Sequence, residues 1–248
     1  MAIVLFLVGT IAGTLNVIAG GGSLLTVPVM IFLGLPPTVA NGTNRVAILV
    51  QNVGALWSFS RHRVVEWSWL RLAAVPAFFG AALGTWLAVR IPDESFQRIL
   101  AVLMVVIALW TVWNPLKRVE VGATLRWAGD RRGRLLLAAA FFGVGVYGGF
   151  IQAGVGFLIL AVISVAGLEL VRGNALKVLV VLAYTPISIA IFAAAGKIDW
   201  GVGSALAAGN LCGAFIGVRL AVLKGHVWIR RVVIVMVIAF AARLLIWG

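Results

Sequence analysis

Residues 1–44, MAIVLFLVGTIAGTLNVIAGGGSLLTVPVMIFLGLPPTVANGTN, contain no Asp, Glu, Lys or Arg. Two further runs, 72–89 and 135–168, are also free of charged residues. A soluble domain has about 25% charged residues, whereas this chain of 248 residues is 11% charged and 63% hydrophobic. A helix crosses the bilayer core with about 20 apolar residues, and these runs are continuous rather than alternating as in barrel strands. The sequence therefore predicts an all-α, polytopic membrane helix bundle.

The composition also limits the kinds of site that the chain can form. No Lys or Arg precedes Arg45, so the basic n-region of a cleaved signal peptide is missing and the first run is expected to be retained. Cys212 is the single cysteine, which excludes an internal disulfide and a cysteine-based metal site. His62 and His226 lie in charged loop segments, far from a second ligand. We expect no cofactor and no metal.

The net charge of +13 does not indicate a nucleic-acid partner. The Lys and Arg residues lie mainly in short segments between apolar runs, where the positive-inside rule places them. A basic patch for nucleic acid would need a soluble face, and the sequence predicts none. The expected surroundings are the lipid bilayer of the cell inner (plasma) membrane, and the expected state is a monomer or a homodimer.

Ten apolar segments follow one another along the chain. The second and seventh are too short to cross the bilayer fully, and each follows a glycine cluster. The predicted segments are 2–19, 23–35, 38–60, 67–90, 95–113, 134–152, 156–168, 171–195, 199–222 and 229–247.

A basic linker, residues 114–133, divides the chain into two similar halves, 1–113 and 134–248. A shift of 133 positions superimposes features of the first half on features of the second. An acid–Trp pair and an Asn at one shared offset are hard to obtain by chance. The sequence therefore predicts an internal duplication. The matches are Gly34 with Gly167, Asn41 with Asn174, Glu66-Trp67 with Asp199-Trp200, Gly80 with Gly213, Gly84 with Gly217 and Arg98 with Arg231.

The charges predict the orientation of the segments. The loop at Arg61 and Arg63 and the central linker are basic, so they belong on the cytoplasmic side. Equivalent loops of the two halves differ in charge: the basic loop at Arg61 matches a neutral one at Lys197, and the neutral loop at Asp93 matches a basic one at Lys224. Such a reversal is what inverted repeats predict. Both termini are then extracytoplasmic.

Two glycine clusters open the short second and seventh segments. Glycine permits backbone conformations that a Cβ forbids, and a helix broken inside the membrane presents the partly positive N–H groups of its new N-terminus to an anion. The alternative is close packing of helices on small residues. The shortness of both segments favours broken or re-entrant helices that face one cavity. The candidate anion-binding residues here are Asn16, Gly20, Gly21, Gly22 and Ser23 in the first half and Gln152, Gly154 and Gly156 in the second.

Polar side chains recur at helical spacing on the third and eighth segments. Such a stripe lines an aqueous cavity or joins helices by hydrogen bonds, and its coincidence with the duplicated glycine clusters favours the cavity. The third segment has Asn41, Asn44, Gln51 and Asn52, and at the same offset the eighth has Asn174, Lys177, Tyr184 and Thr185.

Two cations, Arg45 and Lys177, lie within these stripes. They are expected either to attract an anion or to extend to the lipid headgroups. Every Asp and Glu lies in or beside a predicted loop, so no carboxylate is available for a cation pathway or a proton relay within a helix.

The stretches GTLN (13–16), AGGGSLLTVP (19–28) and ANGTN (40–44) resemble the sulfite exporter TauE/SafE family, as do GGFIQAGVG (148–156) and GNALK (173–177). The likeness extends to the length, the basic linker and the duplication. It implies transport of sulfite, sulfonates or related sulfur-containing organic anions. The second cluster has fewer glycines than this resemblance leads one to expect.

The residues and the resemblance together predict a secondary transporter for a small sulfur-containing anion such as sulfite or sulfoacetate. Asn41, Asn44, Asn174 and Lys177 would supply side-chain donors. A passive anion channel is the alternative that the sequence leaves open. No catalytic constellation is present within a segment, so we do not expect an enzyme.

Overall fold

The computed structural model describes residues 1–64, 67–113, 130–168 and 170–223, and within these ranges every regular element is helical. The predicted all-α bundle is confirmed. The predicted tenth segment and linker residues 114–129 lie outside the described residues. The elements are α1 (Ala2–Ala19), α2 (Ser23–Phe32), α3 (Pro37–Arg61), η1 (Trp67–Trp69), η2 (Leu70–Ala74), α4 (Val75–Ala88), α5 (Asp93–Trp113), α6 (Arg131–Phe150), α7 (Val155–Val165), α8 (Leu170–Ala194) and α9 (Trp200–Leu223).

The end of the linker and the regularity of the fourth segment differ from the prediction. The linker was expected to reach residue 133, but α6 begins at Arg131 because the Asp130 side chain caps it by accepting a hydrogen bond from the Gly133 N–H. The fourth segment is not one regular helix, since η1 and the π-helical η2 precede α4. Pro76 lies at the start of α4, lacks an N–H donor and clashes with the preceding turn, so the wider π turn before it relieves the clash.

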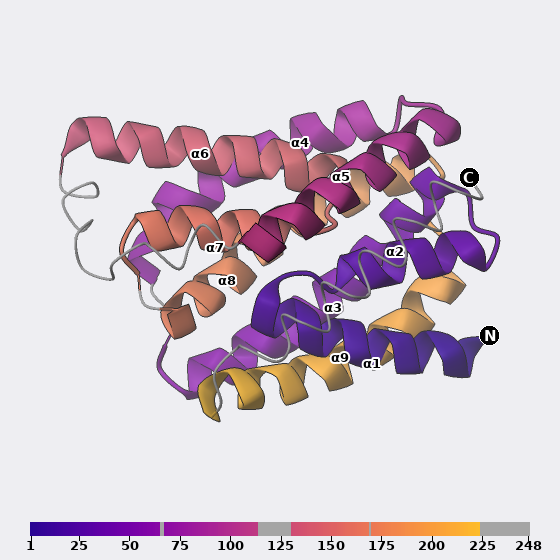
Figure 1. Ribbon diagram of the computed structural model, residues 1–248, viewed down its shortest axis with the longest axis horizontal. Helices are drawn as coiled ribbons and strands as arrows, with labels where there is room; N and C mark the ends of the chain where they lie inside the picture. Colours follow the sequence, from indigo (N-terminus) through magenta and orange to yellow (C-terminus); the bar gives the residue numbers. More distant parts are fainter. Residues whose placement is uncertain (65–66, 114–129, 169, 224–248) are drawn as a thin grey trace.

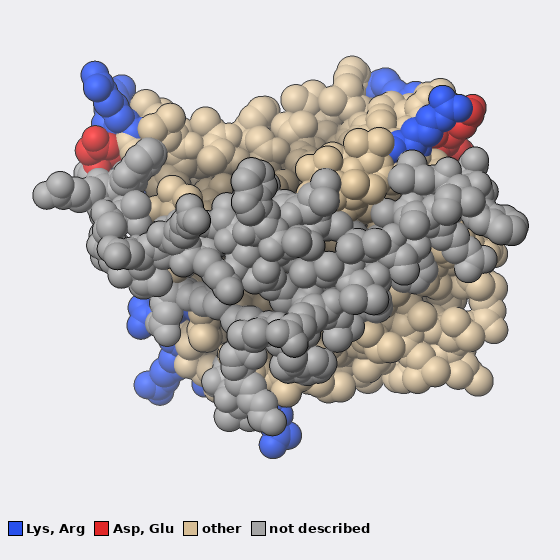
Figure 2. Space-filling view, in the orientation of Figure 1, with Lys and Arg blue, Asp and Glu red and all other residues tan. Residues whose placement is uncertain are grey.

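The apolar helices match the dimensions of a bilayer. Among the described residues, four helical stretches are long and apolar enough to span it: Trp67–Ala88, Arg131–Phe150, Val171–Ala194 and Trp200–Ala221. Three shorter ones, Ala2–Ile18, Ser23–Phe32 and Val155–Val165, are apolar as well. In Figure 2 the Asp and Glu side chains that are visible lie at the left-hand and right-hand ends, and most of the visible Lys and Arg side chains lie there too, with one basic group at the lower edge. This distribution fits helices that run along the membrane normal.

The bundle is organised around two close helix pairs, α1 with α9 and α4 with α6. Figure 1 shows the first pair along the lower edge and the second along the upper edge, with α2, α3, α7 and α8 between them. Small residues permit the close approach. A Cβ added to Gly13 would lie 2.4 Å from the Asn210 carbonyl oxygen, and one added to Gly145 would lie 2.3 Å from that of Ala77.

The two pairs correspond to each other. Asn210 follows Ala77 by 133 residues, the offset that relates the two halves in sequence, and in each pair the first helix of one half packs on the fourth helix of the other. In Figure 1, α1 starts at the right-hand end and α6 at the left-hand end. These contacts are those expected of inverted repeats, and the division of the chain into repeats stays a prediction.

Both predicted helix breaks are present. After α1, Gly20 adopts a left-handed conformation (φ 84°) and its N–H bonds the Asn16 carbonyl oxygen at 2.8 Å. The chain then turns back, so that a Cβ on Gly22 would lie 2.1 Å from the Ala12 carbonyl oxygen. After α6, Gln152 (φ 60°) and Gly154 (φ 75°) are left-handed before α7 begins. Both short helices, α2 and α7, therefore start inside the bundle.

The contact between the two breaks depends on glycine, and we predict that Gly156→Ala destabilises the fold. The new Cβ would lie 2.3 Å from the Gly20 Cα, and overpacking of this kind costs about 1–3 kcal/mol. Gly143→Ala is the matched control because a Cβ there meets nothing within 4 Å. Thermal unfolding in detergent should show a lower midpoint for Gly156→Ala alone. Equal midpoints for the two variants would contradict the tight contact.

Candidate functional site

The two helix breaks touch each other at the centre of the bundle. A Cβ added to Gly20 would lie 2.5 Å from the Gly156 Cα, so the backbones of the two halves are in direct contact there. The C-terminal end of α1 and the first turn of α7 are thereby brought side by side. Because a helix leaves its last four carbonyl groups without partners in the helix, the C-terminal ends of α1 and α6 need donors from elsewhere in the bundle.

Lys177 of α8 supplies such donors to the end of α1. Its Nζ atom donates to the carbonyl oxygens of Asn16 (2.9 Å) and Val17 (2.8 Å) and to Oδ1 of Asn174 (2.8 Å). An ammonium group has three donors, so all of them are used. The positive charge also lies where the dipole of α1 is negative.

Arg45 of α3 has the same role at the end of α6. Its NH2 atom donates to the Gly149 carbonyl oxygen at 2.6 Å, its NH1 atom donates to Oε1 of Gln152 at 3.3 Å, and its guanidinium lies over the Phe192 ring. Asn41 Nδ2 donates to the next carbonyl of α6, that of Phe150, at 2.8 Å. In both cases a polar helix of one half caps the broken helix of the other half.

This arrangement corrects one expectation about the two cations. Arg45 is fully buried and Lys177 is 3% exposed, so the alternative that they extend to the headgroups is wrong. Each cation has carbonyl acceptors inside the bundle. Both cations lie at the C-terminal end of a broken helix, whereas the sequence predicts the anion at the N-terminal ends with Lys177 as a donor.

Gln152 occupies the place where the second cluster departs from the glycine-rich pattern. A non-glycine residue at φ 60° is uncommon because of the strain on its Cβ. Here its Oε1 atom accepts from Arg45 NH1 and, at 3.0 Å, from the Tyr184 hydroxyl. These bonds offset the strain and explain why a side chain stands at the break.

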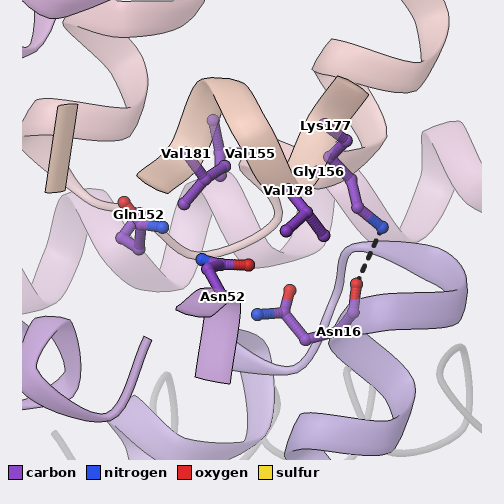
Figure 3. Close-up of a pocket in the computed structure, with 8 residues that line it drawn as sticks. All are labelled: Asn16, Asn52, Gln152, Val155, Gly156, Lys177, Val178 and Val181. Carbon is purple, nitrogen blue, oxygen red and sulfur yellow. Dashed lines mark hydrogen bonds between the residues drawn. The ribbon is translucent and has the colours of Figure 1, made fainter. Parts of the chain in front are cut away.

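A cavity lies beside the junction of the breaks, bounded by α1, α3, α7 and α8 (Figure 3). Its volume is about 10 Å³, which is enough for about one water molecule. An anion of several heavy atoms therefore enters only when the surrounding helices separate. The cavity is lined by Asn16, Asn52, Gln152, Val155, Gly156, Lys177, Val178 and Val181.

The polar lining of the cavity consists of amides, one ammonium group and a helix N-terminus, with no carboxylate. Asn52 is 3% exposed, and its Nδ2 donor has no hydrogen-bond partner. Gly156 lies in the first turn of α7, where backbone N–H groups have no acceptor within the helix. Such a lining favours a ligand with negative charge and several acceptor atoms.

The family model for the sulfite exporter TauE/SafE matches residues 5–244. The chain belongs to the TauE/SafE family. A "Probable membrane transporter protein" of Haemophilus influenzae is 32% identical over 97% of this chain and 93% of its own length. A probable membrane transporter protein of Escherichia coli strain K12 is 30% identical over 98% of this chain and 88% of its own length. Another, of Sinorhizobium sp, is 30% identical over 97% of this chain and 91% of its own length. No solved structure matches significantly. As a TauE/SafE member with several apolar helices, the protein is a multi-pass membrane transporter.

The structure of this TauE/SafE protein brings together only some of the predicted site residues. Asn16, Gln152, Gly156 and Lys177 line the cavity. Other predicted residues contact this lining or the start of α7. Gly20 packs against Gly156, and Gly154 directly precedes α7. Asn174 accepts a hydrogen bond from Lys177, Arg45 and Tyr184 donate to Gln152, and Gln51 Oε1 accepts from Asn16 Nδ2 at 3.3 Å.

The first glycine cluster does not open onto this cavity. Asn44 Nδ2 donates to Ser23 Oγ at 3.0 Å, and Thr26 Oγ1 donates to Asn44 Oδ1 at 2.6 Å, so side chains close the start of α2. Gly21 and Gly22 are buried, and Gly22 packs against α1. Asn41 binds the end of α6. The two helix N-termini therefore do not share one cavity as expected, because only that of α7 borders it.

The structure adds Asn52 and Asn210 to the candidate residues. Asn210 Nδ2 of α9 donates to Gln51 Oε1 at 3.1 Å, which connects α9 to the Asn16–Gln51 pair. Asn52 belongs to the polar stripe of α3, so the stripe signalled it. Asn210 stands alone in an apolar helix, and no sequence pattern distinguished it. In the described ranges, no three His, Cys, Asp or Glu residues come together as metal ligands would.

We predict that Asn52→Leu leaves the free energy of unfolding unchanged or raises it. The substitution removes a buried donor that has no partner, and an unpaired buried polar group costs about 1–3 kcal/mol. Asn44→Leu is the matched control, because it breaks two buried hydrogen bonds and should lower the unfolding midpoint. The measurement is thermal unfolding of both variants without ligand. A large loss of stability for Asn52→Leu would mean that its amide has a structural role.

Proposed function

We propose that this protein is a secondary transporter of small sulfur-containing anions, such as sulfite or sulfonates including sulfoacetate, and that the anion binds in the cavity at the helix breaks. The single observation that supports this most is the lining of the cavity. It combines Lys177, the unpaired amide of Asn52 and the first turn of α7, and it contains no acid. The description of the family supports a sulfur oxyanion as the substrate class.

The contacts around the cavity support a carrier rather than a passive channel. A channel needs a continuous path, whereas this cavity holds about one water molecule. The carbonyls of α1 are tied to α8 through Lys177, and those of α6 are tied to α3 through Arg45. In alternating access, the Lys177 contacts and the Arg45 contacts would break in turn, so that the anion reaches the cavity from one face of the membrane at a time.

The proposed location is the cell inner (plasma) membrane, with both termini extracytoplasmic. The C-terminal end of α3, with Arg61, and the start of α6, with Arg131 and Arg132, lie at the same end of the bundle (Figure 1). The positive-inside rule assigns that end to the cytoplasm. The start of α1 lies at the opposite end in Figure 1.

The proposal predicts that sulfur anions raise the thermal stability of the purified protein. A ligand that binds only the folded state stabilises it by about 2.7 kcal/mol at a concentration of 100 times its Kd. The panel is sulfite, sulfate, thiosulfate, sulfoacetate, taurine, phosphate, acetate and chloride. We expect a selective shift with sulfite or a sulfonate, and we expect Lys177→Ala to remove it.

Arg71→Ala is the control for loss of one positive charge, since Arg71 is exposed and lies in η2, away from the cavity. Its shift should equal that of the wild type. Each shift is measured against the variant's own ligand-free midpoint, so that a change in basal stability does not enter the comparison. Equal shifts in Lys177→Ala and Arg71→Ala would disprove the site. The absence of a shift with every sulfur anion would disprove the substrate class.

A further inference from the structure

The Lys177 ammonium lies in a cage of three neutral oxygen atoms. Two are carbonyl oxygens at the broken end of α1, those of Asn16 and Val17, and the third is Oδ1 of Asn174, all at 2.8–2.9 Å. In transporters with discontinuous helices, such C-terminal half-helix ends coordinate Na⁺ or H⁺. Here a side-chain nitrogen fills that position.

No acid balances the Lys177 charge from the helices around it. The sequences of α1, α3, α7, α8 and α9 contain neither Asp nor Glu. Helices α1 and α7 contain no titratable or charged side chain. Apart from Lys177, those on the remaining three helices are Arg45 and Arg61 on α3, Arg172 and Tyr184 on α8, and Cys212 and Arg219 on α9. Arg45 and Tyr184 meet at Gln152, which lines the opposite side of the cavity from Lys177 in Figure 3.

A buried cation without a counter-charge is unfavourable. Two events remove this cost: an anion enters the adjacent cavity, or the ammonium gives up its proton. An arginine cannot use the second route, because its guanidinium stays protonated in proteins. Lys177 is therefore the residue at the cavity whose charge can change during transport.

We propose that Lys177 couples anion transport to protons: its amine takes up one proton when the anion binds and returns it to water on the side where the anion leaves. This inference rests on the proposed function. Anion binding and protonation favour each other because each supplies the charge that the other lacks, and such linkage is reciprocal. One monoanion and one proton then cross together, so net charge transfer is zero. The empty carrier returns with a neutral amine.

The cage also explains how protonation affects the helices. An ammonium satisfies all three oxygens, whereas a neutral amine has two N–H donors and leaves one oxygen without a partner. Loss of the proton therefore weakens the contact between α8 and the end of α1. The same atom thus senses the anion and holds the two halves together.

The test uses proteoliposomes and radiolabelled isethionate, a sulfonate that stays ionised between pH 5 and 8, so that a pH gradient cannot act on the substrate itself. Wild-type protein should accumulate isethionate against its gradient about tenfold for each unit by which the outside is more acidic. A potassium diffusion potential set with valinomycin should not change this ratio. In the converse assay, an inward isethionate gradient should acidify the lumen, as read by a trapped pH dye.

Lys177→Arg separates coupling from transport. Its charge cannot be released, so isethionate counterflow should persist at a reduced rate, accumulation should no longer follow the pH gradient, and uptake should respond to the membrane potential. Lys197→Arg, the same change in the segment between α8 and α9, should keep wild-type coupling.

The outcomes distinguish the two proposals. Wild-type counterflow without pH-driven accumulation or lumen acidification would disprove proton coupling and leave the transporter intact. No wild-type counterflow would disprove the proposed function for this substrate. Coupling that survives in Lys177→Arg would assign the proton to another group. Should Lys177→Arg fail to fold, the wild-type assays still decide whether transport is coupled to protons, and counterflow by Lys177→Met that no longer follows the pH gradient would assign the proton to Lys177.

Discussion

Backbone carbonyl groups left without partners by two helix breaks shape the whole interior of this protein. Inside a membrane no bulk water is available to bind them, so each must find a donor in the bundle. The donors come from the opposite half of the chain: Lys177 for α1, and Arg45 and Asn41 for α6. The requirement to cap two broken helices therefore places two cations at the centre of an apolar bundle and ties the halves together there.

This solution gives the centre of the bundle its chemical character. The cations offset the negative ends of α1 and α6, and the cavity beside them is left with donors. Several buried polar atoms in the described region have no partner, among them Asn52 Nδ2, Asn174 Nδ2 and Asn210 Oδ1. Natural proteins pair nearly all such groups. These three atoms belong to side chains of α3, α8 and α9, and of these side chains that of Asn52 lines the cavity.

The two halves are alike in packing and unlike at the site. The close pairs α1–α9 and α4–α6 use small residues in matching ways, which fixes the frame. At the breaks, the first cluster has three consecutive glycines whereas the second includes Gln152, and the start of α2 is closed by Asn44 while the start of α7 borders the cavity. In the proposed function, the similar frame would let the halves move against each other, and the differences would restrict anion binding to the cavity beside α7.

The sequence by itself determined the features that depend on local and periodic properties. Uncharged runs predict a membrane protein, the spacing of Asn41, Asn44, Gln51 and Asn52 predicts the polar face of α3, and the glycine clusters predict both breaks. These predictions succeed because helix formation and its interruption depend on neighbouring residues. Tertiary structure alone decided what the polar groups bind. Arg45 reaches its carbonyl across 104 residues and Lys177 across 161, so no local pattern reports these partners. Tertiary structure also decided the position of the cavity, because the sequence predicts one cavity shared symmetrically by both breaks. The hydrogen bonds of Asn44 close the break before α2, and they form only when α2 packs against α3.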